Sequence, residues 1–168
     1  MKKLLPLLLF LILISACRKY RIEHTGCKED AFIEGGLFMP NIFTPSGDGI
    51  NDRLIFHHGS IEISNFSIKI KNAASIKVFE TSDPNFEWDG WCVGGKKCKL
   101  DVYKYEMCFD ASGKHYHIVK RIVIDYTGDK SNGPNACPAQ FNNCAFSAQW
   151  DGARYNPQLP TNEFFGCE

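Results

Sequence analysis

Residues 40–52 read Pro40-Asn41-Ile42-Phe43-Thr44-Pro45-Ser46-Gly47-Asp48-Gly49-Ile50-Asn51-Asp52. Pro45 fixes one backbone φ angle, while Gly47 and Gly49 permit positive φ values that other residues avoid. Two apolar residues at the start of the stretch, Ile42 and Phe43, are suited to anchor it in a hydrophobic core. The stretch is therefore predicted to be a tight loop held at one end by buried side chains.

Three side chains of this loop carry oxygen atoms that suit two different roles. Asp48, Asn51 and Asp52 can accept hydrogen bonds from nearby backbone N–H groups and so form a self-capped turn. Oxygen ligands on a glycine-permitted bend are also what calcium binds. An EF-hand loop would end in a bidentate glutamate, and Phe56 and His57 stand near that position instead. A structural turn and a calcium site are therefore the two interpretations of these residues.

Alternating apolar and polar residues predict β-strands on the C-terminal side of this loop. The pattern runs through residues 66–71, 102–109 and 115–124, and it places the apolar side chains of each segment on one face. Residues 72–75 and 111–114 are typical of hairpin turns. Because strands and short turns dominate, and no long segment of 3.6-residue period follows the N-terminal region, the predicted fold is an all-β, immunoglobulin-like β-sandwich.

The loop and the later segments resemble the gliding-motility-associated C-terminal domain, which is the type B sorting domain of type IX secretion. The family motif typically reads Pro-Asn-(small)-Phe-Thr-Pro-Asn-Gly-Asp-Gly-Ile-Asn-Asp, and this chain departs from it at Ile42 and Ser46. The resemblance covers roughly residues 37–126. It implies a non-enzymatic envelope protein that serves sorting, surface attachment or assembly with the type IX machinery, linked to gliding motility or adhesion. The matching motif positions are Pro40, Asn41, Phe43, Thr44, Pro45, Gly47, Asp48, Gly49, Asn51, Asp52, Trp88, Asp89 and Gly90.

The first residues have the features of an export signal. Lys2 and Lys3 give a basic start, residues 4–14 are apolar, and small residues precede Cys17. The apolar run is shorter than the roughly 20 residues that a membrane-spanning helix needs. The arrangement resembles a bacterial lipoprotein signal in which Cys17 becomes the lipidated N-terminus, and an ordinary cleaved signal is the alternative. Lipidation would anchor the mature chain in the cell envelope, at the outer membrane or the cell surface.

The charge of the mature chain is close to balanced. Loss of residues 1–16 would remove two of the 19 basic residues and leave 17 against 19 acidic ones. No stripe of lysine and arginine interleaved with aromatic residues occurs along the sequence, so nucleic acid is not an expected partner. The predicted organisation is a lipoprotein signal peptide at 1–16, a tether at 17–30, the β-sandwich at 31–126 and a Cys-rich extension at 127–168.

Disulfides are expected in this chain because an exported protein meets an oxidising environment. Cys92 and Cys98 flank a turn-rich segment, and Cys137 and Cys144 enclose a similarly short loop, so each pair is predicted to form a local bridge. Zinc is the rival explanation, but the chain lacks a Cys-x-x-Cys pair. The candidate cysteines are Cys92, Cys98, Cys137, Cys144, Cys27, Cys108 and Cys167, of which one must be left as a free thiol or an intermolecular partner.

The extension at 127–168 is too poor in aliphatic residues to build a core of its own. Cys108 is expected to face outward by strand parity, and Cys27 lies in the opposite terminal segment. At least one of these two residues is therefore predicted to bond to a cysteine of the extension and to hold it against the sandwich.

Aromatic and histidine residues offer further candidate sites. Trp88, beside the Asp89-Gly90 turn, is expected to close one end of the core, and with Trp91 it offers the alternative of a sugar-stacking platform. His115 and His117 share a strand face and would hold a metal only if a third ligand approached. The sequence contains no motif of seryl, zinc-protease or nucleotide chemistry, so an enzyme is not expected. The alternative to a sorting domain is a glycan- or protein-binding adhesion module, in which calcium would be structural.

Overall fold

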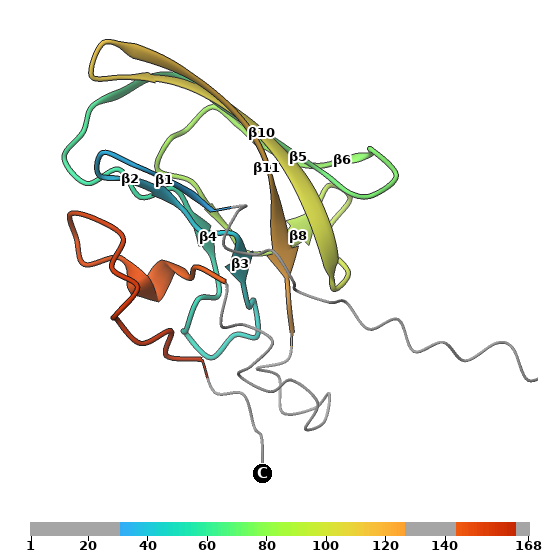
Figure 1. The fold of residues 1–168 in the computed structure, drawn as a ribbon. Helices are drawn as coiled ribbons and strands as arrows, with labels where there is room; N and C mark the ends of the chain where they lie inside the picture. The colour runs from blue at the N-terminus through green and yellow to red at the C-terminus, as the bar shows by residue number, and fades with distance from the viewer. Residues whose placement is uncertain (1–30, 127–143, 164–168) are drawn as a thin grey trace, which may run out of the picture.

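The fold is taken from a computed structural model, which describes residues 31–126 and 144–163. The described chain consists of β-strands joined by short turns, with one 3-10 helix at Ser147–Gln149 (Figure 1). Within it no helix is long and apolar enough to cross a membrane. The strands are β1 (Phe32–Glu34), β2 (Leu37–Met39), β3 (Ile42–Phe43), β4 (Leu54–Ile55), β5 (Ile63–Lys71), β6 (Lys77–Thr81), β7 (Glu87–Trp88), β8 (Trp91–Cys92), β9 (Lys96–Lys97), β10 (Asp101–Ala111) and β11 (Lys114–Ile124).

The larger layer is a five-stranded sheet in the order β3-β11-β10-β5-β6. The long strands β10 and β11 form an antiparallel hairpin along their whole length, from Asp101 opposite Ile124 to Ala111 opposite Lys114. Ser112 and Gly113 have positive φ values at the turn between them, which a tight hairpin requires. β3 joins the free edge of β11 in a parallel sense and brings the start of the motif loop into this sheet.

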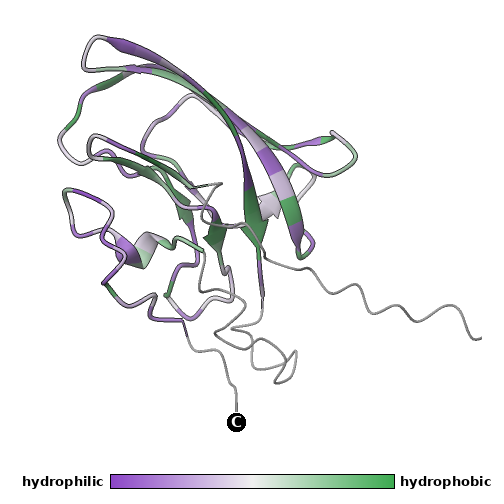
Figure 2. Ribbon diagram, viewed as in Figure 1, coloured by the Kyte–Doolittle hydropathy of each residue, from purple (hydrophilic) through white to green (hydrophobic). Residues whose placement is uncertain are grey.

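The pairs β1-β2 and β4-β7 form the second layer, and a third pair, β8-β9, adjoins β6 at the edge of the main sheet (Figure 1). The core lies between the layers and is rich in aromatic residues: Phe43, Phe56, Phe66, Phe86, Trp88, Tyr103, Tyr105 and Phe109 all belong to it. Figure 2 shows that β2, β3 and β4 are hydrophobic over most of their length, whereas β10 alternates. The structure therefore confirms the predicted all-β, immunoglobulin-like β-sandwich.

The side chains of β10 and β11 follow the predicted alternation. Tyr103, Tyr105, Met107 and Phe109 are buried in the core, and the residues between them face the other side of the sheet. On β11 the inward row is interrupted at Lys120, whose Nζ donates a hydrogen bond to the backbone oxygen of Ala31 at 3.0 Å. Lys120 can face inward at this position because its ammonium group is hydrogen-bonded to a backbone carbonyl at the margin of the core.

Candidate functional site

The loop of residues 44–52 is closed mainly by its own backbone and acidic side chains. Asp52 accepts hydrogen bonds from the N–H groups of Gly47 and Gly49, each at 2.6 Å, through its two carboxylate oxygens. Asp48 accepts from the N–H of Ile50 at 2.9 Å. Gly47 and Gly49 have φ values of 89° and 86°, which residues with a Cβ rarely adopt. The loop therefore has the self-capped form that was predicted as one of its two interpretations.

The same residues do not assemble a calcium site in the structure. Both oxygens of Asp52 and one oxygen of Asp48 are bonded to backbone N–H groups, and Asn51 turns away toward the extension. In residues 31–126 and 144–163, no group of three or more His, Cys, Asp and Glu side chains could hold a metal ion. The geometry favours the structural turn over the predicted calcium site.

Asn51 joins the loop to residues 144–163 with both ends of its side-chain amide. Its Oδ1 accepts from the N–H of Ala148 at 3.0 Å, and its Nδ2 donates to the backbone oxygen of Thr161 at 2.8 Å. Its own φ is 45°, a left-handed conformation that asparagine tolerates better than most residues. A backbone bond from the N–H of Thr44 to the oxygen of Asn51, at 2.9 Å, ties this residue to the base of the loop.

Asn41 forms a second connection between the motif and the extension. It is 1% exposed, and its Oδ1 accepts from the N–H of Ala145 at 2.9 Å while its own N–H donates to the oxygen of Ala145. Its backbone oxygen accepts from Val123 of β11 at 2.8 Å. The Oδ1 atom has the partner that a buried amide oxygen needs, whereas Nδ2 has none within the described residues, and an unpaired group of this kind carries a desolvation penalty of about 1–3 kcal/mol. This motif residue therefore couples the main sheet to the extension.

The carboxylate of Glu163 lies against the loop. Thr44 donates to it through Oγ1, and Asn51 donates through Nδ2 at 2.8 Å. Burial, and secondarily the negative charges of Asp48 and Asp52, raise the pKa of Glu163, although both hydrogen bonds act in the opposite direction. The extension thus places an acid where the buried hydroxyl of Thr44 needs a hydrogen-bond acceptor.

A stack of rings holds the other end of the extension. Phe38 lies within 6.2 Å of Trp150 and 4.8 Å of Tyr155, measured between ring centroids. The ring of His57 is stacked on both Phe38 and Trp150, at 5.6 and 5.3 Å. Aromatic pairs of this kind contribute about 0.5–1.5 kcal/mol each beyond the area they bury. The extension is therefore bound to the sandwich by aromatic packing as well as by hydrogen bonds.

The two parts of the family motif meet at Pro45 and Gly90. Gly90 has a φ of 80°, and a Cβ added to it would lie 3.0 Å from Cγ of Pro45. Trp88 is 2% exposed and packs against Phe43, with its Nε1 donating to the oxygen of Trp91 at 2.8 Å. Trp88 therefore closes one end of the core, which was one of the two roles that the sequence predicted for it.

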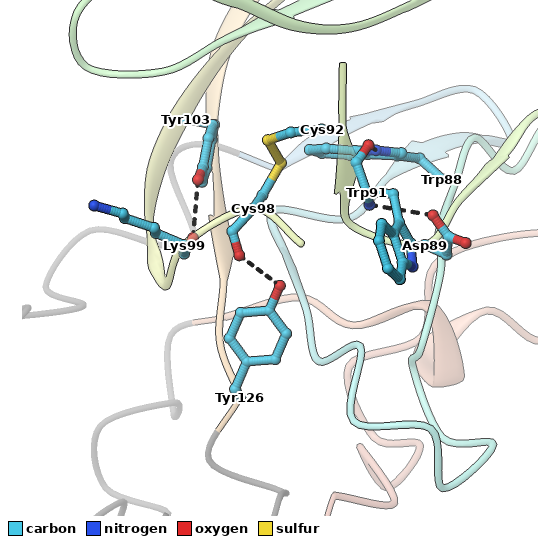
Figure 3. The surroundings of a disulfide bond; sticks show 8 residues. All are labelled: Trp88, Asp89, Trp91, Cys92, Cys98, Lys99, Tyr103 and Tyr126. Carbon is cyan, nitrogen blue, oxygen red and sulfur yellow. Dashed lines mark hydrogen bonds between the residues drawn. A yellow bond between two sulfur atoms is a disulfide. The ribbon is translucent and has the colours of Figure 1, made fainter. Parts of the chain in front are cut away.

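The predicted disulfide between Cys92 and Cys98 is confirmed, with Cα atoms 5.2 Å apart (Figure 3). It closes the turn between β8 and β9 next to the motif. The N–H of Cys98 donates to the oxygen of Gly90 at 2.8 Å, and Tyr126 donates from its hydroxyl to the oxygen of Cys98 at 2.8 Å. The bridge thus fixes the segment that carries the Trp-Asp-Gly part of the motif.

Cys108 is a free cysteine on the outer face of β10, so it does not supply the bond to the extension. Cys27 lies outside the described residues, so the prediction that Cys27 or Cys108 bonds to a cysteine of the extension stays a prediction. One sequence-based interpretation is wrong. The sugar-stacking platform fails because Trp88 is buried in the core while Trp91 is 48% exposed, so the two rings do not share a surface.

The remaining cysteine and histidine predictions have different outcomes. Cys144 is disulfide-bonded. Cys17, Cys27, Cys137 and Cys167 lie outside the described residues, so the pairings and the lipidation predicted for them stay predictions.

His115 and His117 lie on the outer face as predicted. His115 pairs with Asp110 at 2.6 Å and His117 with Glu106 at 3.0 Å, both at exposed positions. Each histidine is thus engaged with its own acidic neighbour rather than with a common metal site.

The partners of the motif in the extension were not found from the sequence. Glu163 and Ala145 carry no local pattern that points to the motif, which precedes them by about a hundred residues. The sequence offered one indication of these contacts. Asn41, Thr44 and Asn51 are polar residues close to the apolar Ile42 and Phe43, so each would need a hydrogen-bond partner if it were buried.

The fold and the loop together define an immunoglobulin-like β-sandwich domain built around a structured surface turn. The profile of the CHU_C type IX secretion signal domain matches residues 37–123, which is just over half of the chain. The chain therefore belongs to this family of type IX secretion signal domains, as the sequence resemblance predicted. The match runs from β2 into β11 and stops before the extension. No curated protein matches the chain.

Proposed function

We propose that the chain is a non-enzymatic lipoprotein of the cell envelope whose β-sandwich serves as a type IX sorting and surface-attachment domain. The observation that carries this proposal is the family match over residues 37–123. A lipid on Cys17 would hold the mature protein at the outer membrane or cell surface, and the type IX machinery would be the partner of the sandwich. Links to gliding motility or adhesion belong to the same proposal.

The geometry of the motif loop supports a role in recognition. Gly47, Asp48 and Gly49 are exposed at its apex, and the N–H groups of both glycines donate to the carboxylate of Asp52, which fixes their backbone. A loop that is held in one conformation loses little conformational entropy when a partner binds, and this favours affinity and specificity. The apex is therefore the surface that we assign to the secretion machinery.

A display experiment tests this assignment. A reporter inserted in the 17–30 segment of the full-length chain should reach the cell surface in a host with type IX secretion and should stay inside a strain that lacks it. Asp52→Ala should abolish surface display, because both glycine N–H groups of the apex lose their acceptor. The matched control is Asp83→Ala, since Asp83 caps the N–H of Asn85 at 2.9 Å in another exposed loop.

Surface protease accessibility measures display, and thermal melting confirms that both variants are folded. Equal display in the secretion-deficient strain would overturn the proposal. So would an Asp52→Ala variant that is displayed as well as Asp83→Ala.

A further inference from the structure

A row of basic side chains crosses the outer face of the five-stranded sheet. Lys104 of β10 lies directly opposite Arg121 of β11 on one side and Lys71 of β5 on the other. Lys71 is in turn opposite Lys77 of β6, so the row spans four neighbouring strands. Lys69 lies two residues along β5 on the same face, opposite Glu106 of β10 and Glu80 of β6. The sequence did not reveal this row because its members come from four different segments.

The row works against the stability of the sheet. Like charges that are directly opposite each other on adjacent strands repel and destabilise the pairing. Lys77 has an acidic partner, Glu80, at 2.8 Å, but Lys69, Lys71 and Lys104 form no ion pair with any residue in the described part of the chain. Lys71 and Lys104 have only basic residues directly opposite them on the neighbouring strands, an arrangement that folding does not require and that points to a ligand.

The row lines a hollow of about 500 Å³ on this face. Its other walls are Asn72 and Ser75 of the turn between β5 and β6, and Val119 of β11, which is 45% exposed. Glu106 is the one acid among the residues lining this hollow. Its carboxylate interacts with Nε2 of His117 at a distance of 3.0 Å. The surface thus offers positive charge, polar groups that hydrogen-bond hydroxyls, and an apolar side chain.

We propose that this hollow binds an acidic polysaccharide, a chain of sugars that carry carboxylates, laid across β5, β10 and β11. Lysine and arginine would pair with the carboxylates, Asn72 and Ser75 with ring hydroxyls, and Val119 with the apolar face of a ring. This inference does not rest on the sorting function, because no residue of the motif at 40–52 lines the hollow, although Arg121 is only two residues from Val123, the partner of Ile42 on β11.

The strand spacing disfavours an extended acidic peptide laid across the sheet. Neighbouring strands are about 4.8 Å apart, so the basic residues of the row recur at about that interval. In an extended peptide, the side chains that point to one side come from every second residue and are about 6.7 Å apart. Single-stranded nucleic acid is disfavoured because it needs exposed aromatic rings for stacking, and the rings of Tyr103 and Tyr105 are buried in the core.

Binding of polygalacturonate to the purified full-length protein tests the proposal, with dextran as the uncharged polymer and polyglutamate as the acidic peptide. We expect binding to polygalacturonate that weakens with added salt, and no binding to dextran. Lys71→Gln/Lys104→Gln should weaken the affinity about tenfold, because two exposed charge pairs are lost. The melting temperature of this variant should stay the same or rise, since like-charge neighbours have been removed.

The matched control is Lys96→Gln/Lys99→Gln, which removes the same charge from exposed positions near the β8-β9 turn. Its affinity should stay within about twofold of the unmodified protein. Equal loss in both variants would show non-specific attraction and overturn the proposal. Absence of polygalacturonate binding, or tighter binding of polyglutamate, would overturn it as well.

Discussion

His57 illustrates how the surroundings of one side chain set the pH dependence of folding. Its ring packs against the rings of both Phe38 and Trp150, and within the described residues its Nε2 has no hydrogen-bond partner. Burial, and secondarily the charge of His58, lower the pKa of His57 from 6.5 to about 4. The stack therefore requires the neutral imidazole, because a buried imidazolium would lie among aromatic rings without a partner.

We predict that His57 destabilises the fold as the solution becomes acidic. The pKa of His57 is lower in the folded protein than in the unfolded chain. Between pH 6.5 and about pH 4, the unfolded chain therefore binds more protons at this residue than the folded protein does. The contribution of the neutral ring is fully present above pH 6.5 and is lost as the pH falls toward 4, by up to about 3 kcal/mol.

The variant His57→Phe tests this prediction, because phenylalanine keeps the stack but cannot be protonated. Urea denaturation at several pH values should show that its advantage over the unmodified protein grows as the pH falls through this window. His115→Gln is the control, since His115 is an exposed residue paired with Asp110. A constant difference between His57→Phe and the unmodified protein from pH 4.5 to 7.5 would refute the assignment, given the window that linkage sets.

At this scale the sequence predicted local contacts and missed distant ones. The hydrogen bonds from Asp48 and Asp52 span at most five residues, and the spacing of glycine and aspartate indicated them directly. The hydrogen bond from the N–H of Ala145 to Oδ1 of Asn41 spans 104 residues. No local pattern encodes such a pair, because only the folded topology brings its two segments together.

At the level of single elements, long strands were predictable and short ones were not. β5, β10 and β11 have nine to eleven residues and show a clear alternation of apolar and polar positions. β4, β7 and β8 have two residues each, which is too few to show any period. Their positions depend on what surrounds them, as the contact between Leu54 and Trp88 across the β4-β7 pair shows.

The turn at Gly90 provides a prediction for the element that carries the second half of the motif. Gly90→Ala should destabilise the protein by about 1 kcal/mol more than Gly113→Ala does. Both glycines have positive φ values, so alanine is strained at either position. Only at Gly90 would the new Cβ meet a neighbour, Cγ of Pro45 at 3.0 Å, whereas nothing lies within 4 Å at Gly113.

Denaturation in urea at neutral pH measures both free energies of unfolding. Similar losses in the two variants would mean that Pro45 moves aside without cost. In that case the contact between the two parts of the motif would not contribute to stability.

For the whole molecule, residues 144–163 change how the sandwich is completed. The clusters that include Phe146 and Ala145 bury Ile42, Val123 and Phe38 on the sides of β3, β11 and β2 that face away from the main core. The sequence predicted that the extension at 127–168 has no core of its own and that disulfides hold it to the sandwich. Aromatic stacking and backbone hydrogen bonds to motif asparagines share that task, which composition cannot reveal.

The state of every cysteine in the molecule can be predicted by combining these observations. Cys92 and Cys98 are paired, Cys108 is free and Cys144 is bonded. If Cys17 is acylated, Cys27, Cys137 and Cys167 are the candidates that supply the partner of Cys144, and the other two can pair with each other. The mature protein should then contain a single free thiol, at Cys108.

Alkylation of the denatured, non-reduced protein followed by peptide mapping counts the thiols, and labelling with a palmitate analogue reports the lipid. Acylation should be lost in Cys17→Ser, together with partitioning into detergent, because several acyl chains on that residue provide the predicted anchor. If Cys17 were retained without a lipid, seven cysteines other than Cys108 would be available for disulfides. Because that number is odd, a second free thiol or an intermolecular bridge would have to appear beside Cys108. Two labelled cysteines and no lipid would therefore refute the lipoprotein assignment, while one labelled cysteine other than Cys108 would contradict the outward, unpaired position of that residue on β10.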